Sequence, residues 1–167
     1  LAAIWIGIKY RMTPGEIQNG LDNFELSKMR LEVINKNNIK IIDDTYNASP
    51  DSMRAAIDVL KSMKADRKIA VLGDMFEMGD FAEEGHRNVG SYLADKKIDL
   101  LVTVGEMAYW IALEAKKNGL ENMFTVSTNE DAIDILKRNI RDNDAVLVKG
   151  SRGMAMEEIV RSLQEGS

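Results

Sequence analysis

The chain has 167 residues, of which 45% are hydrophobic and 29% charged, and its formal net charge is −5. This length suits one full domain and a fragment of another, and the acidic balance argues against a large nucleic-acid surface, which is usually basic. No run approaches the roughly 18 apolar residues of a membrane span. The sequence has no cysteine and one histidine, His86, which excludes disulfides, cysteine-ligated zinc and a multi-histidine metal site within these residues. A cytoplasmic protein with no nucleic-acid or membrane partner is expected.

The first 26 residues are typical of the end of a preceding domain. Residues 1–10 form an apolar run with small residues, as at the end of a packed helix. Thr13-Pro14-Gly15-Glu16 then predicts a short helix to about Asn23, because it combines a capping threonine, an early proline and an acidic residue in the first turn. Such a segment is too small to enclose its own core. Since the sequence also begins at Leu1 rather than methionine, we expect part of a longer protein, with residues 1–26 closing one domain and 27–167 forming the next.

From residue 30 onward, short apolar runs alternate with amphipathic stretches. Strands are predicted at 31–34, 39–42, 68–72, 100–104, 123–126 and 145–148, with the polar turn 35–38 joining the first two. Helices are predicted at 52–64, 81–96, 106–118 and about 129–140, and a last helix carries Met156 to Leu163. This alternation predicts an α/β fold, a Rossmann-like, doubly wound and mostly parallel six-stranded sheet, in which the initial hairpin adds one antiparallel edge strand.

The end of the second predicted strand is the most informative stretch. Asp43 and Asp44 follow a buried apolar run, and Ser49-Pro50-Asp51 is a strong helix-start signal. Open α/β sheets build ligand sites at the rim formed by the carboxyl ends of their strands. Two carboxylates there suit a ribose or a cation, since they would repel a bare phosphate. The alternative is that both are ordinary turn and capping residues, and spacing alone does not decide between the two.

Two further loops of the predicted rim are rich in polar groups. Lys149-Gly150-Ser151-Arg152-Gly153 places two cations and a hydroxyl before a helix, which favours a carboxylate or phosphate, although a glycine turn with solvated charges is the alternative. The segment 73–79 contains Asp74 and Glu77, which are either site carboxylates or ordinary surface acids. His86 falls inside a predicted helix, where a lone histidine is more often packed than catalytic. The sequence contains neither a Gly-x-x-x-x-Gly-Lys-Ser/Thr loop nor a Gly-x-Gly-x-x-Gly motif.

These motifs together resemble one known family. Asp43-Asp44-Thr-Tyr-Asn-Ala-Ser-Pro-Asp-Ser-Met53, Leu72-Gly-Asp-Met-Phe-Glu-Met-Gly79 and Val148-Lys-Gly-Ser-Arg152, in this order, resemble the C-terminal domain of the Mur ligase family, and most closely its MurF branch. Met29-Arg30-Leu31-Glu32 is similar to the family's Gly-Arg-Leu-Glu segment, with Met29 in place of the usual glycine. Tyr46-Asn47-Ala48 stands where sister ligases have a histidine-containing loop, which favours the MurF branch. The likeness covers essentially the whole chain.

The resemblance implies an ATP-dependent ligase that forms an amide bond and adds D-Ala-D-Ala to UDP-MurNAc-tripeptide in peptidoglycan synthesis. ATP and Mg²⁺ would be held mainly by the family's central domain, whose P-loop and metal ligands are missing from this sequence. These residues alone are therefore expected to be inactive, to hold no metal and to supply no assigned catalytic residue. A monomer is expected.

The resemblance also assigns site residues by their position in the motifs. The ATP-binding residues would be Arg30, Asp43, Asp44, Tyr46 and Asn47, with Arg30 and Asp44 at the adenine and ribose. The residues facing the dipeptide or the peptide carboxylate would be Lys149, Ser151 and Arg152, and those near the cleft would be Asp74, Glu77 and His86.

Two other functions stay open on the sequence. Another ligase of the Mur and folylpolyglutamate synthase superfamily would share the loop chemistry and change only the acid and the amine. A stand-alone nucleotide- or anion-binding module would also lack a P-loop.

Overall fold

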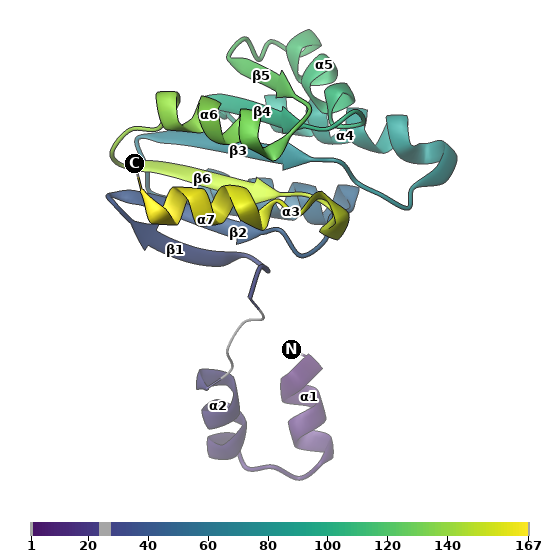
Figure 1. Ribbon diagram of the computed structural model, residues 1–167. Helices are drawn as coiled ribbons and strands as arrows, with labels where there is room; N and C mark the ends of the chain where they lie inside the picture. The colour runs from purple at the N-terminus through teal and green to yellow at the C-terminus, as the bar shows by residue number, and fades with distance from the viewer. Residues whose placement is uncertain (1, 24–27, 167) are drawn as a thin grey trace.

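The computed structural model describes residues 2–23 and 28–166 (Figure 1). Leu1 and the expected domain boundary between residues 26 and 27 lie outside the described residues. Two helices, α1 (Ala2–Lys9) and α2 (Pro14–Asp22), stand apart from the sheet. α2 begins as predicted, because the Thr13 hydroxyl accepts a hydrogen bond from the Glu16 N–H and the Glu16 carboxylate accepts one from the Thr13 N–H. Only Gly7 is buried in this helix pair, so the pair has no core of its own.

Six strands form one sheet in the order β1-β2-β6-β3-β4-β5. They are β1 (Glu32–Lys36), β2 (Ile39–Asp44), β3 (Arg67–Gly73), β4 (Leu100–Val104), β5 (Met123–Val126) and β6 (Asp144–Lys149). β1 is antiparallel to β2 at one edge and the other pairs are parallel, which confirms the predicted fold class. The hairpin turn is tighter than predicted, because only Asn37 and Asn38 lie between the strands. Their φ angles of 49° and 62° are left-handed values that asparagine tolerates.

Helices cover both faces of the sheet (Figure 1). α3 (Pro50–Ser62), α4 (Ala82–Ala94) and α5 (Tyr109–Lys117) pack on one face, and α6 (Asn129–Asn139) and α7 (Glu157–Glu165) on the other. Alternate strand residues supply the two cores, since Ala70 and Leu72 pack with α3 to α5 whereas Ile69 and Val71 pack with α6 and α7. Among the described residues, no helix combines the length and apolar character that crossing a membrane requires.

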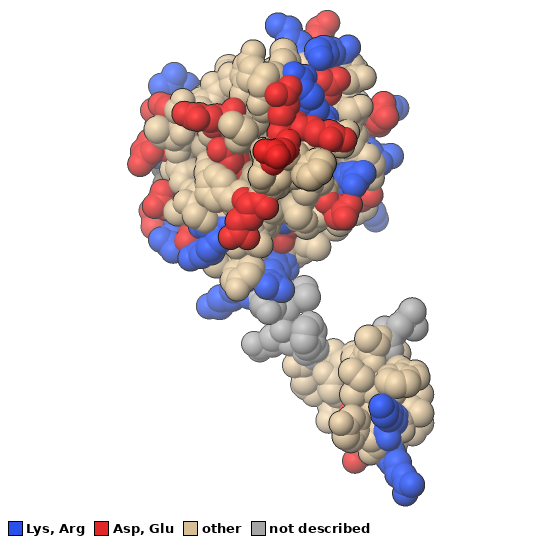
Figure 2. Space-filling view, turned by 90° about the vertical axis from the view of Figure 1, so that its right-hand side faces the viewer, with Lys and Arg blue, Asp and Glu red and all other residues tan. Residues whose placement is uncertain are grey.

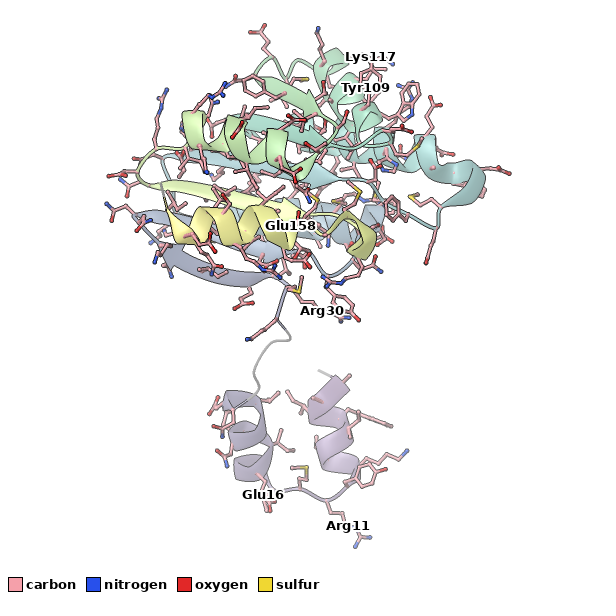
Figure 3. The ribbon with its side chains drawn as sticks, viewed as in Figure 1. Arg11, Glu16, Arg30, Tyr109, Lys117 and Glu158 are labelled. Carbon is pink, nitrogen blue, oxygen red and sulfur yellow. The ribbon has the colours of Figure 1, made fainter. Side chains whose placement is uncertain are left out.

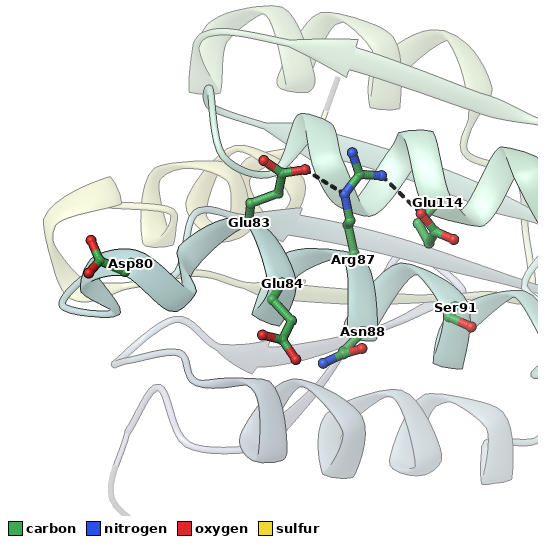
Figure 4. Close-up of a pocket in the computed structure, with 7 residues that line it drawn as sticks. All are labelled: Asp80, Glu83, Glu84, Arg87, Asn88, Ser91 and Glu114. Carbon is green, nitrogen blue, oxygen red and sulfur yellow. Dashed lines mark hydrogen bonds and ion pairs between the residues drawn. The ribbon is translucent and has the colours of Figure 1, made fainter.

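α4 and α5 approach closely because Gly90 has no side chain. A Cβ atom at Gly90 would lie 2.3 Å from the backbone carbonyl oxygen of Ile111 on α5. Arg87 on α4 joins the same two helices (Figure 4), because its Nη1 donates to Glu114 on α5 at 3.0 Å, while its Nε donates to Glu83 on α4 itself at 2.7 Å. Ion pairs near the surface each contribute little to stability. The backbone contact at Gly90 is therefore the more sensitive feature of this helix pair.

An ion pair lies where the parallel strands β3 and β6 begin, at the edge of the sheet opposite the rim. Asp144 at the start of β6 is 1% exposed, and its two oxygens accept hydrogen bonds from Arg67 Nε at 3.0 Å and Nη2 at 2.6 Å. Asp144 Oδ2 also accepts from the Arg141 N–H at 2.8 Å, and Arg67 Nη2 donates to the Asn139 carbonyl at 2.6 Å. Asp144 and Arg67 together therefore join the starts of β3 and β6 to the end of α6 and to the residues that follow it.

Candidate functional site

The carboxyl ends of β2, β6 and β3 are neighbours in the sheet, so the loops 43–49, 149–153 and 73–79 meet on the rim, as predicted. In the strand register, Asp44 lies opposite Lys149, and Lys149 lies opposite Leu72. Figure 2 views the molecule from this side, where acidic side chains are scattered across the surface and basic ones lie mostly toward its margins. Two pockets open at this rim, and the loops after β4 and β5 line neither of them.

The start of α3 shapes the loop that follows β2. The Ser49 hydroxyl accepts a hydrogen bond from the Ser52 N–H at 3.4 Å, and the Ser52 hydroxyl accepts one from the Ser49 N–H at 2.9 Å. Pro50 occupies the first turn. These contacts confirm the helix-start signal, although α3 begins at Pro50 rather than at residue 52. The cap therefore anchors the end of the loop that carries Tyr46 and Asn47.

The first pocket has a volume of about 470 Å³ and brings together four of the five residues predicted to bind ATP, namely Arg30, Asp44, Tyr46 and Asn47. The Arg30 guanidinium lies 4.3 Å from the centre of the Tyr46 ring, and the Tyr46 N–H donates to the Met29 carbonyl at 3.1 Å. Figure 3 shows Arg30 where the chain enters the sheet. A stacked planar cation and ring beside a carboxylate offer both a flat surface and a polar acceptor. This combination suits a nucleoside.

Lys149 also lines the first pocket, but its charge is already paired. Its side chain is 2% exposed, and Nζ donates to Asp44 Oδ2 at 2.5 Å and to the Asn47 carbonyl at 2.8 Å. The other Asp44 oxygen accepts from the Leu31 N–H at 3.1 Å. The structure therefore does not bring Lys149 and Arg152 together as one anion site, because Arg152 lines the second pocket instead.

The second pocket has a volume of about 450 Å³ and adjoins the first, since both are lined by the segment 46–49. The loops after β3 and β6 complete it with Phe76, Glu77, Met78, Ser151, Arg152 and Gly153. Glu77, Ser151 and Arg152 therefore share this pocket with Tyr46 and Asn47, so that five residues predicted to lie at the site line it.

Ser151 fastens the two loops of the second pocket to each other. Ser151 is 3% exposed. Its N–H donates to the Asp74 carbonyl at 2.9 Å, and its hydroxyl accepts from the Phe76 N–H at 2.8 Å. Arg152 and Glu77 are exposed, and Arg152 Nη1 lies 3.0 Å from Glu157 Oε1. Arg152 is thus the cation of this loop that a ligand in the second pocket can reach.

Asp74 and His86 line neither pocket and instead support the loop 73–79. Asp74 Oδ1 accepts from the Ala108 N–H at 2.6 Å, just before α5, which begins at residue 109 rather than at the predicted 106. His86 is fully buried, accepts from the Met75 N–H through Nε2 at 2.9 Å, and has Nδ1 2.6 Å from the Ala82 carbonyl. Because burial lowers the His86 pKa, the neutral ring with its proton on Nδ1 fits this pair of contacts. These contacts favour the interpretation that His86 is a packed residue over the prediction that it lies near the cleft.

Sequence reasoning missed several lining residues. These are Leu31, Ala48, Ser49, Ser52 and Ala55 in the first pocket and Phe76, Met78 and Gly153 in the second. A signal existed for part of the first set, because Ser49, Ser52 and Ala55 are spaced by three residues and fall on one face at the start of α3. No comparable spacing marks Phe76 or Met78.

Asp43 does not join Asp44 in the first pocket. β2 extends through Asp44, so the two side chains project to opposite faces of the sheet. Asp43 is 6% exposed and accepts hydrogen bonds from the Thr45 N–H and hydroxyl. Burial raises the Asp43 pKa, the Thr45 hydrogen bonds oppose this shift, and the charges of Glu32 and Glu157 add to it. The two carboxylates therefore do not converge on one ligand.

Replacing Asp43 with asparagine is expected to stabilise the domain at neutral pH. A carboxyl group whose pKa is raised by folding favours the folded state only while it is protonated, and this contribution is lost as pH rises through the folded-state pKa. Asparagine keeps an acceptor for Thr45 without the charge. We expect Tm at pH 7 to rise, and the gain to vanish as pH falls toward the ordinary pKa of 3.8. Asp134→Asn, an exposed position on α6, is the control, and an unchanged or lower Tm at pH 7 would contradict the prediction.

Comparison with known proteins identifies relatives of this chain. Residues 29–152 match the family model described as Mur ligase, glutamate ligase domain. The UDP-N-acetylmuramoyl-tripeptide–D-alanyl-D-alanine ligase of Bacillus subtilis is 38% identical over 168 aligned positions, which cover 99% of this chain and 37% of the relative. A MurF crystal structure from Acinetobacter baumannii superposes with a TM-score of 0.85 at 33% identity, covering 98% of this chain and 36% of that one.

A second solved structure adds a ligand to the comparison. The MurF ligase of Thermotoga maritima, determined in complex with ADP, superposes with a TM-score of 0.82 at 25% identity and covers 97% of this chain and 36% of that one. The chain thus spans little more than a third of the length of the relatives it matches. With most of its residues inside the matched family model, the chain belongs to the Mur ligase family and contains its glutamate ligase domain.

Proposed function

We propose that the chain is the C-terminal domain of an ATP-dependent ligase that joins D-Ala-D-Ala to UDP-MurNAc-tripeptide. The observation that supports this most is the pair of adjoining pockets, which the family's three motif loops build at the ends of β2, β6 and β3. The relatives that match nearly the whole chain bear this activity in their names. Residues 1–26 would close the central ATPase domain. A monomer in the cytoplasm stays a prediction.

The first pocket would take the nucleotide. Arg30 and Tyr46 would contact the base, and Asp44 would accept a hydrogen bond from the ribose, because each carboxylate oxygen can accept more than one. Asp43 would contribute only indirectly, through the end of β2. ATP and Mg²⁺ would be held mainly outside these 167 residues, since the sequence contains no P-loop motif.

The second pocket would take the dipeptide. Arg152 would bind its carboxylate, with Ser151 and Glu77 alongside. The tripeptide carboxylate would attack the γ-phosphorus of ATP, giving an acyl phosphate and ADP. The dipeptide amine would then attack the acyl carbon, lose its proton to solvent and expel phosphate as the amide forms. This domain would contribute positioning and water exclusion, with no covalent bond to the protein.

The test is phosphate release by the full-length ligase that carries this domain. We expect release to require both UDP-MurNAc-tripeptide and D-Ala-D-Ala, and Arg30→Ala to raise the KM for ATP. Arg138→Ala, at an exposed position on α6, is the control and should leave that KM unchanged. The 167-residue polypeptide alone should release no phosphate.

Two outcomes would overturn the assignment. Activity with a different amine would indicate another ligase of the superfamily, because the loop chemistry is shared. Nucleotide binding without ligation by the full-length protein would favour a nucleotide- or anion-binding module.

A further inference from the structure

Lys149 is the largest fully buried side chain of the described residues and it is charged. Removing an ammonium group from water is costly unless partners replace its hydration. Two partners do so here, the Asp44 carboxylate at 2.5 Å and the Asn47 carbonyl at 2.8 Å. The contacts follow from strand pairing, because Lys149 at the end of β6 lies in register with Asp44 at the end of β2 and parallel neighbours project to the same face.

Lys149 has few hydrogen-bond donors and little exposed surface left for a substrate. An ammonium group has three N–H donors, of which two are used within the protein. Its side chain is 2% exposed, and it lines the first pocket but not the second. A dipeptide seated beside Arg152 would therefore meet Ser151 and not Lys149.

The partners of Lys149 are themselves parts of the nucleotide pocket. Asp44 is held between Lys149 on one oxygen and the Leu31 N–H on the other, which fixes the direction of its carboxylate. The contact to the Asn47 carbonyl fixes the loop that places Tyr46 beneath Arg30. A compact ammonium can serve a carboxylate and a carbonyl at once, whereas the wider planar fork of arginine has a different geometry.

We propose that Lys149 is a positioning residue for the nucleotide, acting through Asp44 and the Asn47 carbonyl, and that it does not contact the dipeptide. The inference rests on the proposed function for the identity of the two ligands. The proposal gives two residues of the same motif loop different roles, because Lys149 supports the first pocket and Arg152 lines the second.

The test is a double-mutant cycle on the full-length ligase with Lys149→Met, Asp44→Asn and the two combined. Two quantities are measured, the Kd for ADP by titration and the KM for D-Ala-D-Ala. Lys149→Met should weaken ADP binding by about tenfold, which corresponds to about 1.4 kcal/mol, and leave the dipeptide KM within about twofold. Because Lys149 acts partly through Asp44, the double variant should lose less ADP affinity than the sum of the losses in the two single variants.

Control measurements distinguish a loss of folding from a loss of ligand binding. Lys61→Met, an exposed lysine on α3, should change neither quantity. Circular dichroism and Tm establish that each variant is folded at the assay temperature. Should Lys149→Met fail to fold because Asp44 is left as an unpaired buried charge, Asp44→Asn with Lys149→Gln removes both charges and is compared with Asp44→Asn alone.

Two results would overturn the proposal. One is a raised dipeptide KM in Lys149→Met with unchanged ADP binding, which would indicate direct contact with the dipeptide. The other is an additive loss of ADP affinity in the double variant. Failure of the proposed function is a separate result, because the parent ligase would then not use D-Ala-D-Ala while its ADP affinity could still be measured in every variant.

Discussion

Asp144→Ala is expected to lower the free energy of unfolding by about 3 kcal/mol, because removing one partner of a buried ion pair leaves the other uncompensated. The substitution deprives Arg67, whose side chain is 22% exposed, of two hydrogen bonds and deprives the Arg141 N–H of its acceptor. Tm should fall by roughly 6–12 °C for a domain of this length. Urea unfolding followed by circular dichroism measures the change.

The matched control for this variant lies two positions earlier. Asp142→Ala removes an exposed carboxylate whose contact with Asn38 is 3.3 Å long, and we expect a change below about 0.5 kcal/mol. Arg67→Met combined with Asp144→Leu should recover part of the loss, because replacing both members of a buried pair is often close to neutral. A loss below 1 kcal/mol in Asp144→Ala would mean that solvent replaces the carboxylate, contrary to the prediction.

Gly90→Ala is expected to destabilise the domain by about 2–3 kcal/mol, although alanine favours helices by about 1 kcal/mol over glycine. The added methyl group would lie 2.3 Å from the Ile111 carbonyl oxygen and 3.1 Å from its carbon, and a backbone group cannot turn aside as a side chain can. α5 would have to move away from α4. Thermal and urea unfolding should both report the loss.

Gly85→Ala on the same helix provides the comparison. Its new methyl group would meet the Met78 Cε atom at 2.2 Å, which is the far end of a flexible side chain. A small loss of stability in Gly85→Ala together with a large one in Gly90→Ala would show that the backbone contact between the helices causes the loss. Similar losses at both positions would instead indicate general crowding around α4.

The fold was predictable because its signals are local. Each strand is a short apolar run, and helix starts are marked by residues such as Thr13 and Ser49, whose partners lie within three positions along the chain. β4 and β5 occupy the predicted residues 100–104 and 123–126. Errors occur where a distant group acts on an element, as at α5, where Asp74 from the loop after β3 binds the Ala108 N–H before the helix begins.

The site was predictable only as a set of loops. Which motif residues face a ligand depends on partners that are remote in sequence, and Lys149 finds Asp44 across a separation of 105 positions. Asp43 was expected beside Asp44 because the predicted strand ended at residue 42. Two more residues in β2 turn the pair to opposite faces. His86 likewise binds Met75 because α4 folds back beneath the loop 73–79, a contact that no spacing in the sequence encodes.

The strand order affects how the domain folds while it is being synthesised on the ribosome. Of the six strands of this sheet, β6 is synthesised last, yet it lies between β2 and β3 and pairs with both. Until it emerges, the nascent chain has two incomplete sheets, each with an unpaired and apolar edge that invites aggregation. Lys149, Ser151 and Arg152 end or follow this strand. Closing the sheet and assembling both pockets are therefore one event. If the first pocket takes a nucleotide, as proposed, a nascent chain lacking β6 would gain no protection from it, whereas a chain that includes β6 would.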